Sequence, residues 1–302
     1  MRHRFASQCR RLALIALIGG SGCGADQDGA DPLSEGIAYL REGNAAAAID
    51  RLTEAIRRGA DPLEARVHRG EAYLRTGAVE KAVEDFAWVA REDPKNAEAH
   101  YQLAVASTRG GRLDRALEAL TRAIESQPDL VKAYVNRSDV LSRLGKTREA
   151  IADCNEALRL DPYNAPVHAN RGVFLSQIGE RAKAVADWEA AIQLNPQFAG
   201  GYFSRGVDHG IHGEFQEAVS DLTKALEVAP EHTGARRSRA AAHAALGEHA
   251  LAVEDLTELI RRYPSEARLY VERSHSHRAL GRNAEAEADE QRARELMAGG
   301  RK

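Results

Sequence analysis

The chain has 302 residues, which is more than one hydrophobic core usually serves, so two domains or an array of repeats is expected. Aromatic residues make up only 5%, whereas alanine, leucine, arginine and glutamate are abundant, and this composition favours close-packed helices over sheets. The formal net charge is −3, and it falls to −7 when the four arginines of residues 1–22 are left out. Either value disfavours general nucleic-acid binding, which needs a strongly basic surface.

The first 22 residues have the three-part layout of a secretory signal. The basic segment MRHRFASQCRR is followed by the apolar run LALIALI and by the small residues GGSG before Cys23. The apolar run is too short to cross a bilayer, which needs about 20 residues. We therefore expect a cleaved signal peptide over residues 1–22 and a short linker over residues 23–28.

The segment GGSGC resembles the lipoprotein box of bacterial signal sequences, in which the cysteine becomes the lipid-bearing first residue of the mature protein. The resemblance implies lipidation of Cys23 and a membrane anchor in the bacterial cell envelope, on the periplasmic or extracytoplasmic side. Gly20 stands where that family prefers a larger aliphatic residue, so secretion without an anchor is the alternative. Loss of Cys9 and lipidation of Cys23 would leave Cys154 alone, which excludes a disulfide within one mature chain.

Beyond this start, the sequence repeats itself every 34 residues. Glycine recurs at that step, and alanine follows five residues later each time: Gly43, Gly77, Gly111, Gly145, Gly179, Gly213, Gly247 and Gly281, then Ala48, Ala82, Ala116, Ala150, Ala184, Ala218, Ala252 and Ala286. Prolines from Pro94 to Pro264 keep the same step. Glycine supplies a tight turn and proline ends or opens a helix, so each period is predicted to be an αα-hairpin.

Setting Gly43 at position 15 makes the repeats begin at residues 29, 63, 97, 131, 165, 199, 233 and 267. Positions 8 and 20 then always hold small residues and position 27 usually does, while position 24 is mostly a large apolar residue such as Phe86 or Trp188. In period, small residues and terminal proline the chain resembles the tetratricopeptide repeat family. The resemblance implies an all-α fold, a right-handed αα superhelical solenoid of eight repeats over residues 29–300.

Positions 7 and 23 carry a recurring pair of opposite charges. The pairs are Arg69 with Asp85, Arg137 with Asp153, Arg171 with Asp187, Arg205 with Asp221, Arg239 with Asp255, and Arg273 with Asp289. Repeat 1 reverses the signs with Glu35 and Arg51, and repeat 3 drops both charges with Leu103 and Ala119. Pairing between successive repeats would set Arg51 against Arg69, so a structural salt bridge within each hairpin is expected.

The stretch RGVDHGIHGE, residues 205–214, concentrates polar groups that could suggest a metal site. His209 falls at position 11, a packing position, and Gly213 is the recurring turn glycine, so the stretch is predicted to be a helix end with packed, hydrogen-bonded histidines. Metal binding through His209, His243 and His277, which share position 11, is the less favoured alternative. A metal site needs three or four converging ligands, and neither HExxH nor paired CxxC motifs occur.

The sequence also lacks a Gly-rich phosphate loop and a GxSxG nucleophile motif. Cys154 occupies the apolar position 24 and is expected to be an inert core thiol. A protein without enzymatic activity, cofactor or metal is therefore predicted.

In the tetratricopeptide family the first helix of each repeat lines a concave groove, and positions 2, 5, 6, 9, 12 and 13 most often contact ligands. Carried over to this sequence, the resemblance implies the following candidate partner-binding residues: Arg41, Arg75, Arg109 and Arg143 at position 13, Asn136 and Asn170 at position 6, and Tyr101 and Phe203 at position 5. Asparagine suits the backbone of an extended peptide, and the aromatic residues suit apolar anchoring. Alternatively, the arginines form a solvated helix face.

These features together predict a cell-envelope lipoprotein that acts as an interaction scaffold or adaptor and holds a peptide or protein partner in the groove. The alternative is a structural array that organises an envelope complex without a ligand in the groove.

Overall fold

A computed structural model describes residues 31–299 of the protein. Within that range the secondary structure consists of sixteen α-helices and no strands. The all-α architecture expected from the sequence is therefore confirmed. The signal peptide, the linker and Cys23 lie outside the described residues.

The helices pair in chain order into eight hairpins. Their bounds are α1 (Pro32–Arg41), α2 (Ala45–Arg57), α3 (Pro62–Arg75), α4 (Val79–Glu92), α5 (Ala97–Arg109), α6 (Leu113–Ser126), α7 (Val131–Arg143), α8 (Thr147–Leu160), α9 (Ala165–Gln177), α10 (Arg181–Leu194), α11 (Ala199–Ile211), α12 (Phe215–Val228), α13 (Thr233–Ala245), α14 (His249–Arg262), α15 (Ala267–Ala279) and α16 (Asn283–Gly299). From the third repeat onward, the first helix begins at the residue where the repeat begins.

The first two hairpins instead begin at proline. Asp31 and Asp61 cap α1 and α3 by accepting hydrogen bonds from backbone N–H groups of the first turn, and Pro32 and Pro62 follow them. Proline has no N–H to donate and a fixed φ that suits the first helical residue, so this order of residues starts a helix.

The turn within each hairpin depends on the recurring glycine. All eight of these glycines have positive φ, between +71° and +83°, a region that side chains with a Cβ rarely adopt. The short turn keeps the two helices of a hairpin in direct contact.

Small residues let those two helices approach closely. The eight alanines at position 20 are fully buried, as are the large side chains of Phe86 and Trp188 at position 24. A Cβ added at Gly70 would lie 2.8 Å from the Phe86 ring, and one at Gly172 would lie 2.5 Å from Trp188. Position 8 is therefore small because position 24 of the same hairpin fills the space.

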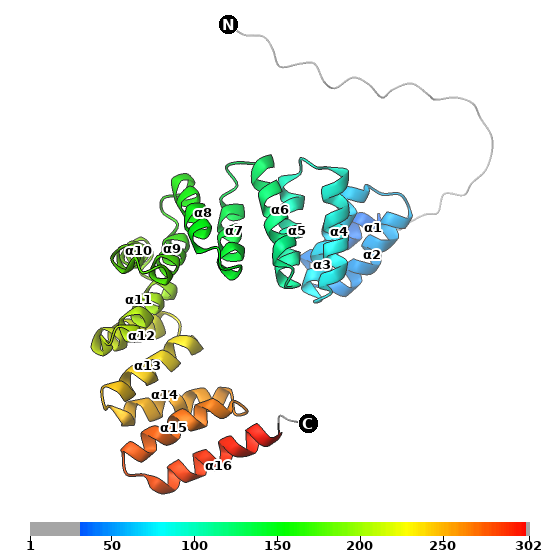
Figure 1. Cartoon of the computed structure of the whole chain (residues 1–302). Coiled ribbons are helices and arrows are strands. Elements are labelled where there is room, and N and C mark those ends of the chain that lie inside the picture. Colours follow the sequence, from blue (N-terminus) through cyan, green and yellow to red (C-terminus); the bar gives the residue numbers. More distant parts are fainter. Residues whose placement is uncertain (1–30, 300–302) are drawn as a thin grey trace, which may run out of the picture.

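The hairpins are stacked along one continuous arc from α1 to α16 (Figure 1). Odd-numbered helices contact the odd-numbered helix of the next repeat at α1/α3, α5/α7, α9/α11 and α11/α13, and within residues 31–299 no two even-numbered helices do so to the same extent. In a curved stack, the row of helices that lies closer together is on the inner side. We call the surface of the odd-numbered helices the inner face.

No helix in residues 31–299 combines the length and the apolar character that crossing a bilayer requires.

Candidate functional site

The six arginine and aspartate pairs at positions 7 and 23 lie between the two helices of each hairpin. In every pair the arginine donates two hydrogen bonds to the two carboxylate oxygens, at 2.7–2.8 Å. The aspartates are only 2–6% exposed. Hydrogen bonding to these carboxylates raises the pKa of all six arginines. The pairs are thus bidentate and largely shielded from water.

The two exceptional repeats differ in the structure as well. In repeat 1, Arg51 Nε lies 3.0 Å from a carboxylate oxygen of Glu35, and their side chains are 49% and 29% exposed. In repeat 3, Leu103 and Ala119 are buried in an apolar cluster around Phe86 and Leu120. Positions 7 and 23 thus form an ion pair within seven of the eight hairpins, and in repeat 3 both positions are buried in the same apolar cluster.

The arginines also contact the preceding repeat, which was not predicted from the sequence. Arg69, Arg137, Arg239 and Arg273 donate to threonine hydroxyls at position 25 of the repeat before, at 3.0–3.3 Å. Arg171 donates to the Asn155 side chain at 2.8 Å, and Arg205 lies 3.9 Å from Glu189. We call this chain of arginines, aspartates and position 25 acceptors the ladder.

The sequence did contain a signal for this contact. Position 25 is an acceptor in each repeat that precedes an arginine, whereas it is Ala87 in the repeat that precedes Leu103. The acceptor is thus missing at the one boundary within the array where the next repeat has no arginine.

The candidate arginines at position 13 are exposed, and three of them also bond to the protein itself. Arg75 donates to the backbone carbonyl of Leu40, at 2.7 Å, and to the Glu71 carboxylate. Arg109 reaches the carbonyl of Leu74 at 3.5 Å, and Arg143 lies 3.7 Å from Asp139. These contacts satisfy carbonyls near the ends of the preceding inner helices and place acids beside the arginines.

The other candidates at positions 5 and 6 differ in their surroundings. The Asn136 side chain donates to the Tyr101 hydroxyl at 3.1 Å, and Lys132 lies over the Tyr101 ring. Asn170 is exposed. Phe203 packs against the His232 ring at 4.5 Å between centroids. The structure therefore distributes the candidate set along the inner face and does not bring it together at one point.

The stretch at residues 205–214 forms part of a polar network between repeats 5 and 6. Asp208 is 3% exposed and accepts hydrogen bonds from Ser176 Oγ at 3.0 Å and from Arg181 Nε at 2.7 Å. Arg181 also donates to both carboxylate oxygens of Glu214. These bonds join α9 and α10 to α11. They lie where the second helix of one hairpin contacts the first helix of the next least extensively, because α10 and α11 contact each other less than any other such pair within residues 31–299.

Histidines of the same stretch belong to this network. His209 Nδ1 lies 2.5 Å from Glu214 and His212 Nδ1 lies 2.8 Å from the backbone carbonyl of Asp208. Hydrogen bonds from Arg181 and then from His209 lower the pKa of the Glu214 carboxyl to about 2. The stretch is thus a helix end and its turn, held by side-chain hydrogen bonds.

The three histidines at position 11 do not form a shared site. His243 bonds its own Glu248 at 2.6 Å, as His209 bonds Glu214. His277 is buried, but its Nδ1 has no hydrogen-bond partner in the described range, because repeat 8 has Arg282 where the two preceding repeats have glutamate. Among residues 31–299, no group of three or more His, Cys, Asp and Glu side chains could hold a metal ion.

Cys154 lies in the core and is 1% exposed. Burial raises the pKa of its thiol to about 11. A thiol that stays protonated is a poor nucleophile.

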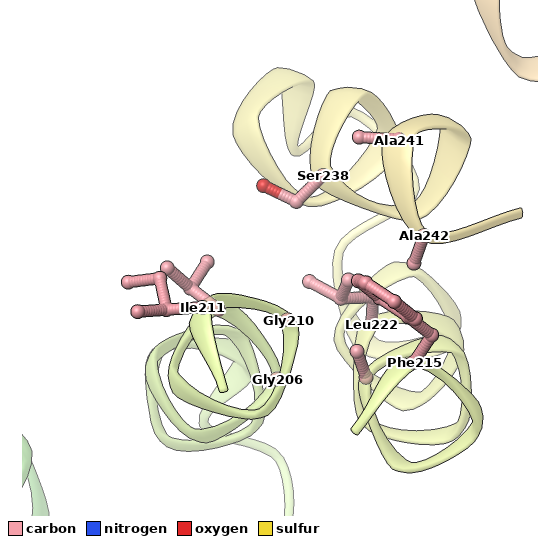
Figure 2. Close-up of a pocket in the computed structure, with 10 residues that line it drawn as sticks. Gly206, Gly210, Ile211, Phe215, Leu222, Ser238, Ala241 and Ala242 are labelled. Atoms are coloured by element: carbon pink, nitrogen blue, oxygen red, sulfur yellow. The ribbon is translucent and has the colours of Figure 1, made fainter. Parts of the chain in front are cut away.

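The inner face has a hollow between α11, α12 and α13, with a volume of about 240 Å³. Figure 2 shows Ile211 on one side, Leu222 and Phe215 on another, and Ser238 and Ala242 of α13 above them. Gly206 and Gly210 contribute no side chain to fill it. We call this the apolar hollow, and it was not predicted from the sequence.

A second hollow, of about 480 Å³, adjoins the first between α13, α14 and α15 and shares Ser238 and Ala241 with it. Its charged lining consists of Arg237, Arg268 and Glu272. His249 and His275 also line it. We call this the cationic hollow.

A family model for the tetratricopeptide repeat matches residues 33–87, 79–130, 109–165, 209–267 and 242–299, which together cover most of the chain. The chain belongs to the tetratricopeptide repeat family. Repeats of this family generally serve as scaffolds for protein interactions rather than as enzymes.

Solved structures show the same fold. A tetratricopeptide repeat protein from Parabacteroides merdae is 20% identical, with a TM-score of 0.61 over 78% of this chain and 93% of that one. The MamA protein is 24% identical, with a TM-score of 0.50 over 55% of this chain and 91% of that one. No curated protein matches the sequence.

Proposed function

We propose that this protein is an envelope-located tetratricopeptide adaptor whose inner face binds a peptide segment of a protein partner. The observation that carries the proposal is the pair of adjoining hollows on the inner face, over α11–α15. Concave surfaces that are partly apolar, with a few polar groups, are typical binding sites. Helical repeats that line a continuous groove suit an extended chain better than a compact ligand.

The inner face also offers groups that suit a peptide backbone. Asn170 is exposed, and an amide can both donate to and accept from a peptide group. Farther along the same face, the Ser238 hydroxyl stands between the two hollows. These polar groups support binding of an extended chain whose side chains enter the hollows.

The proposed envelope location rests on residues 1–23 of the sequence. A lipid on Cys23 would hold the first repeat near the membrane surface and leave the inner face accessible. The test is to grow cells with an alkyne fatty acid and compare the natural chain with Cys23→Ala. We expect label and membrane fractionation for the natural chain and neither for the variant, and a labelled variant contradicts the anchor.

Binding by the inner face is tested by capture from solubilised envelopes with residues 24–302 as bait. One variant carries Arg109→Glu and Arg143→Glu on the inner face. The matched control carries Arg122→Glu and Arg159→Glu on α6 and α8, whose side chains are 61% and 64% exposed. The two variants change the net charge equally, so only the face differs.

A partner that is held by the natural bait and the control but lost by the inner-face variant supports an adaptor that uses its groove. A partner lost only by the control supports the alternative, a structural array that contacts other proteins through its outer helices. The absence of any partner contradicts the adaptor role.

A further inference from the structure

We infer that the inner face over α11–α15 binds an extended peptide that carries one apolar and one acidic side chain about three residues apart. This inference rests on the proposed function, because it specifies the ligand of the same groove. The apolar side chain enters the apolar hollow, and the acidic side chain enters the cationic hollow.

The apolar hollow suits an uncharged hydrocarbon side chain. Ser238 is the one side chain in its lining that carries a hydroxyl, and no charged residue lines it. Ile211, at its edge, is 74% exposed, which is unusual for an isoleucine. About 240 Å³ corresponds to roughly eight water molecules of about 30 Å³ each, which is enough for an aliphatic or aromatic side chain. Transfer of such a side chain out of water is favourable.

The hollow exists because of residues particular to repeat 6. Position 12 is leucine, threonine or serine in the first five repeats but Gly210 here, and position 13 changes from a basic or polar residue to Ile211. A Cβ built at Gly210 would meet only Ala218, at 3.9 Å. The space over Gly210 is therefore open to a ligand side chain.

The cationic hollow has more positive than negative groups. Arg237 donates to both carboxylate oxygens of Glu272, at 2.5 and 3.2 Å, and Arg268 donates to one of them at 3.1 Å. Two guanidinium groups thus share one carboxylate, so the lining itself carries one more positive than negative charge. The hydrogen bond to Glu272 raises the pKa of Arg237, and Glu266, which is not part of the lining, also helps to raise it. An acidic side chain would complement this positive excess and could accept a hydrogen bond from Arg268, whose side chain is 72% exposed.

The spacing follows from the helix geometry. The hollows lie on either side of α13 and share two of its residues, so their centres are about one interhelical distance apart, roughly 10 Å. A peptide in the extended polyproline II conformation advances about 3.1 Å per residue with three residues per turn, so side chains three residues apart lie about 9 Å apart and point the same way. Two side chains about three residues apart therefore reach the two hollows together.

The test begins with selection of phage-displayed random 12-residue peptides on the purified full chain. Selected sequences are then synthesised with amidated ends, so that only side-chain carboxylates are present, and titrated by fluorescence anisotropy. We expect enrichment of an apolar and an acidic residue about three apart. Changing the acidic residue to its amide, or the apolar residue to serine, should weaken binding at least tenfold.

Protein variants locate the binding site. Gly210→Leu should weaken binding at least tenfold by filling the apolar hollow. Arg268→Glu should weaken it at least tenfold by reversing a charge, and because the Arg268 side chain is 72% exposed, this variant is expected to fold normally. The control Arg159→Glu on α8 makes the same charge change on an even-numbered helix and should leave binding unchanged. Circular dichroism establishes that each variant is folded.

The two proposals fail in different ways. Selected peptides that lack the pattern, or that bind Gly210→Leu and Arg268→Glu as well as the natural chain, overturn this inference. If such peptides still lose binding with Arg109→Glu and Arg143→Glu, the groove function stands. Recovery of no binding peptide overturns both.

Discussion

The inner face differs between the early repeats and the late ones, although the scaffold is the same. In the early repeats, long side chains bond to one another or to backbone, as Arg75 does with Leu40 and Asn136 with Tyr101. In the late repeats, the small residues Gly210 and Ala241 line hollows between neighbouring helices. The helical scaffold thus determines where side chains lie, and a few residues per repeat decide whether the groove is filled or open.

The ladder is common to both regions, and breaking one of its ion pairs should cause the largest loss of folding stability. Asp187→Arg places two cations together between α9 and α10, where Asp187 accepts from Arg171 and lies 3.2 Å from His168 Nδ1. Removing one partner of a buried ion pair costs about 3–5 kcal/mol of unfolding free energy. Urea unfolding followed by circular dichroism measures the loss.

Two further variants identify the cause. Adding Arg171→Asp should recover part of the stability lost with Asp187→Arg, because opposite charges face each other again. Glu35→Arg breaks the more exposed pair of repeat 1 and should cost less than about 1 kcal/mol. If the double variant recovers nothing, the pair does not explain the loss.

Two glycines on α11 should respond in opposite ways to the same substitution. Gly206→Ala places a Cβ 2.9 Å from Leu222 and 3.1 Å from Asp221, so overpacking should cost about 1–3 kcal/mol. Gly210→Ala should instead stabilise the protein by about 0.5–1 kcal/mol, because the helix gains an alanine and the added methyl group enters the open hollow. Thermal unfolding of the two variants compares a filled position with an open one, and equal effects would contradict that distinction.

We call the polar network between repeats 5 and 6, around Arg181, Asp208 and Glu214, the junction. Its contribution to stability should depend on pH through Glu214. Its pKa is lowered from 4.5 to about 2, so the carboxylate contributes stability above about pH 4.5 and loses that contribution as the pH falls towards 2. Glu214→Gln should therefore lower the melting temperature at pH 7, and the difference from the natural chain should narrow below about pH 4.5. Melting curves between pH 7 and pH 3 measure this.

Glu258→Gln is the matched control for the junction. The pKa of Glu258 is also lowered to about 2, but by Arg261 and Arg262 of its own helix. At pH 7, Glu214→Gln should speed amide hydrogen exchange in α11, whereas Glu258→Gln should not. Equal exchange in α11 for both variants would show that Glu214 does not hold the junction.

The last prediction is that the Cys154 thiol does not react with thiol reagents in the folded protein. With its thiol pKa near 11, about one thousandth of the groups is ionised at pH 8, and the side chain is buried. In a chain with Cys9→Ser and Cys23→Ser, Ellman's reagent should react with Cys154 only after unfolding. A cysteine placed at Tyr163, which is 80% exposed, should react at once. Rapid reaction of Cys154 in the native protein would mean that the core of the early repeats opens.

Much of the fold could be predicted from the sequence because each repeat uses the same residues for the same purpose. The recurring glycines require a positive φ, and the small residues at position 8 face large ones at position 24, so a period of 34 indicates both turns and packing. The start of α1 at Pro32, three residues into its repeat, depends on a local cap at Asp31.

The two hollows of the inner face were less predictable because they arise where side chains are missing. An arginine at position 13 is visible in a sequence, but the hollow over Gly210 arises from missing side chains on α11 and their position relative to α13. The same holds for Arg237 and Arg268, which meet at Glu272 from two different helices. The contact between position 7 and position 25 of the preceding repeat could have been found, because Ala87 and Leu103 depart from the pattern together.

The ladder has a consequence for how such a chain can grow in evolution. Each arginine bonds one aspartate in its own unit and one acceptor in the unit before, so a duplicated 34-residue unit would form the same bonds at both of its new boundaries. Genetic recombination between repeats could therefore change the length of the array by whole units without creating a mismatched boundary. Repeat 1 is one exception, because it carries Glu35 in place of the arginine. The boundary between Ala87 and Leu103 is another: Ala87 has no acceptor for an arginine and Leu103 has no donor for an acceptor, so a viable rearrangement would have to inherit the two together.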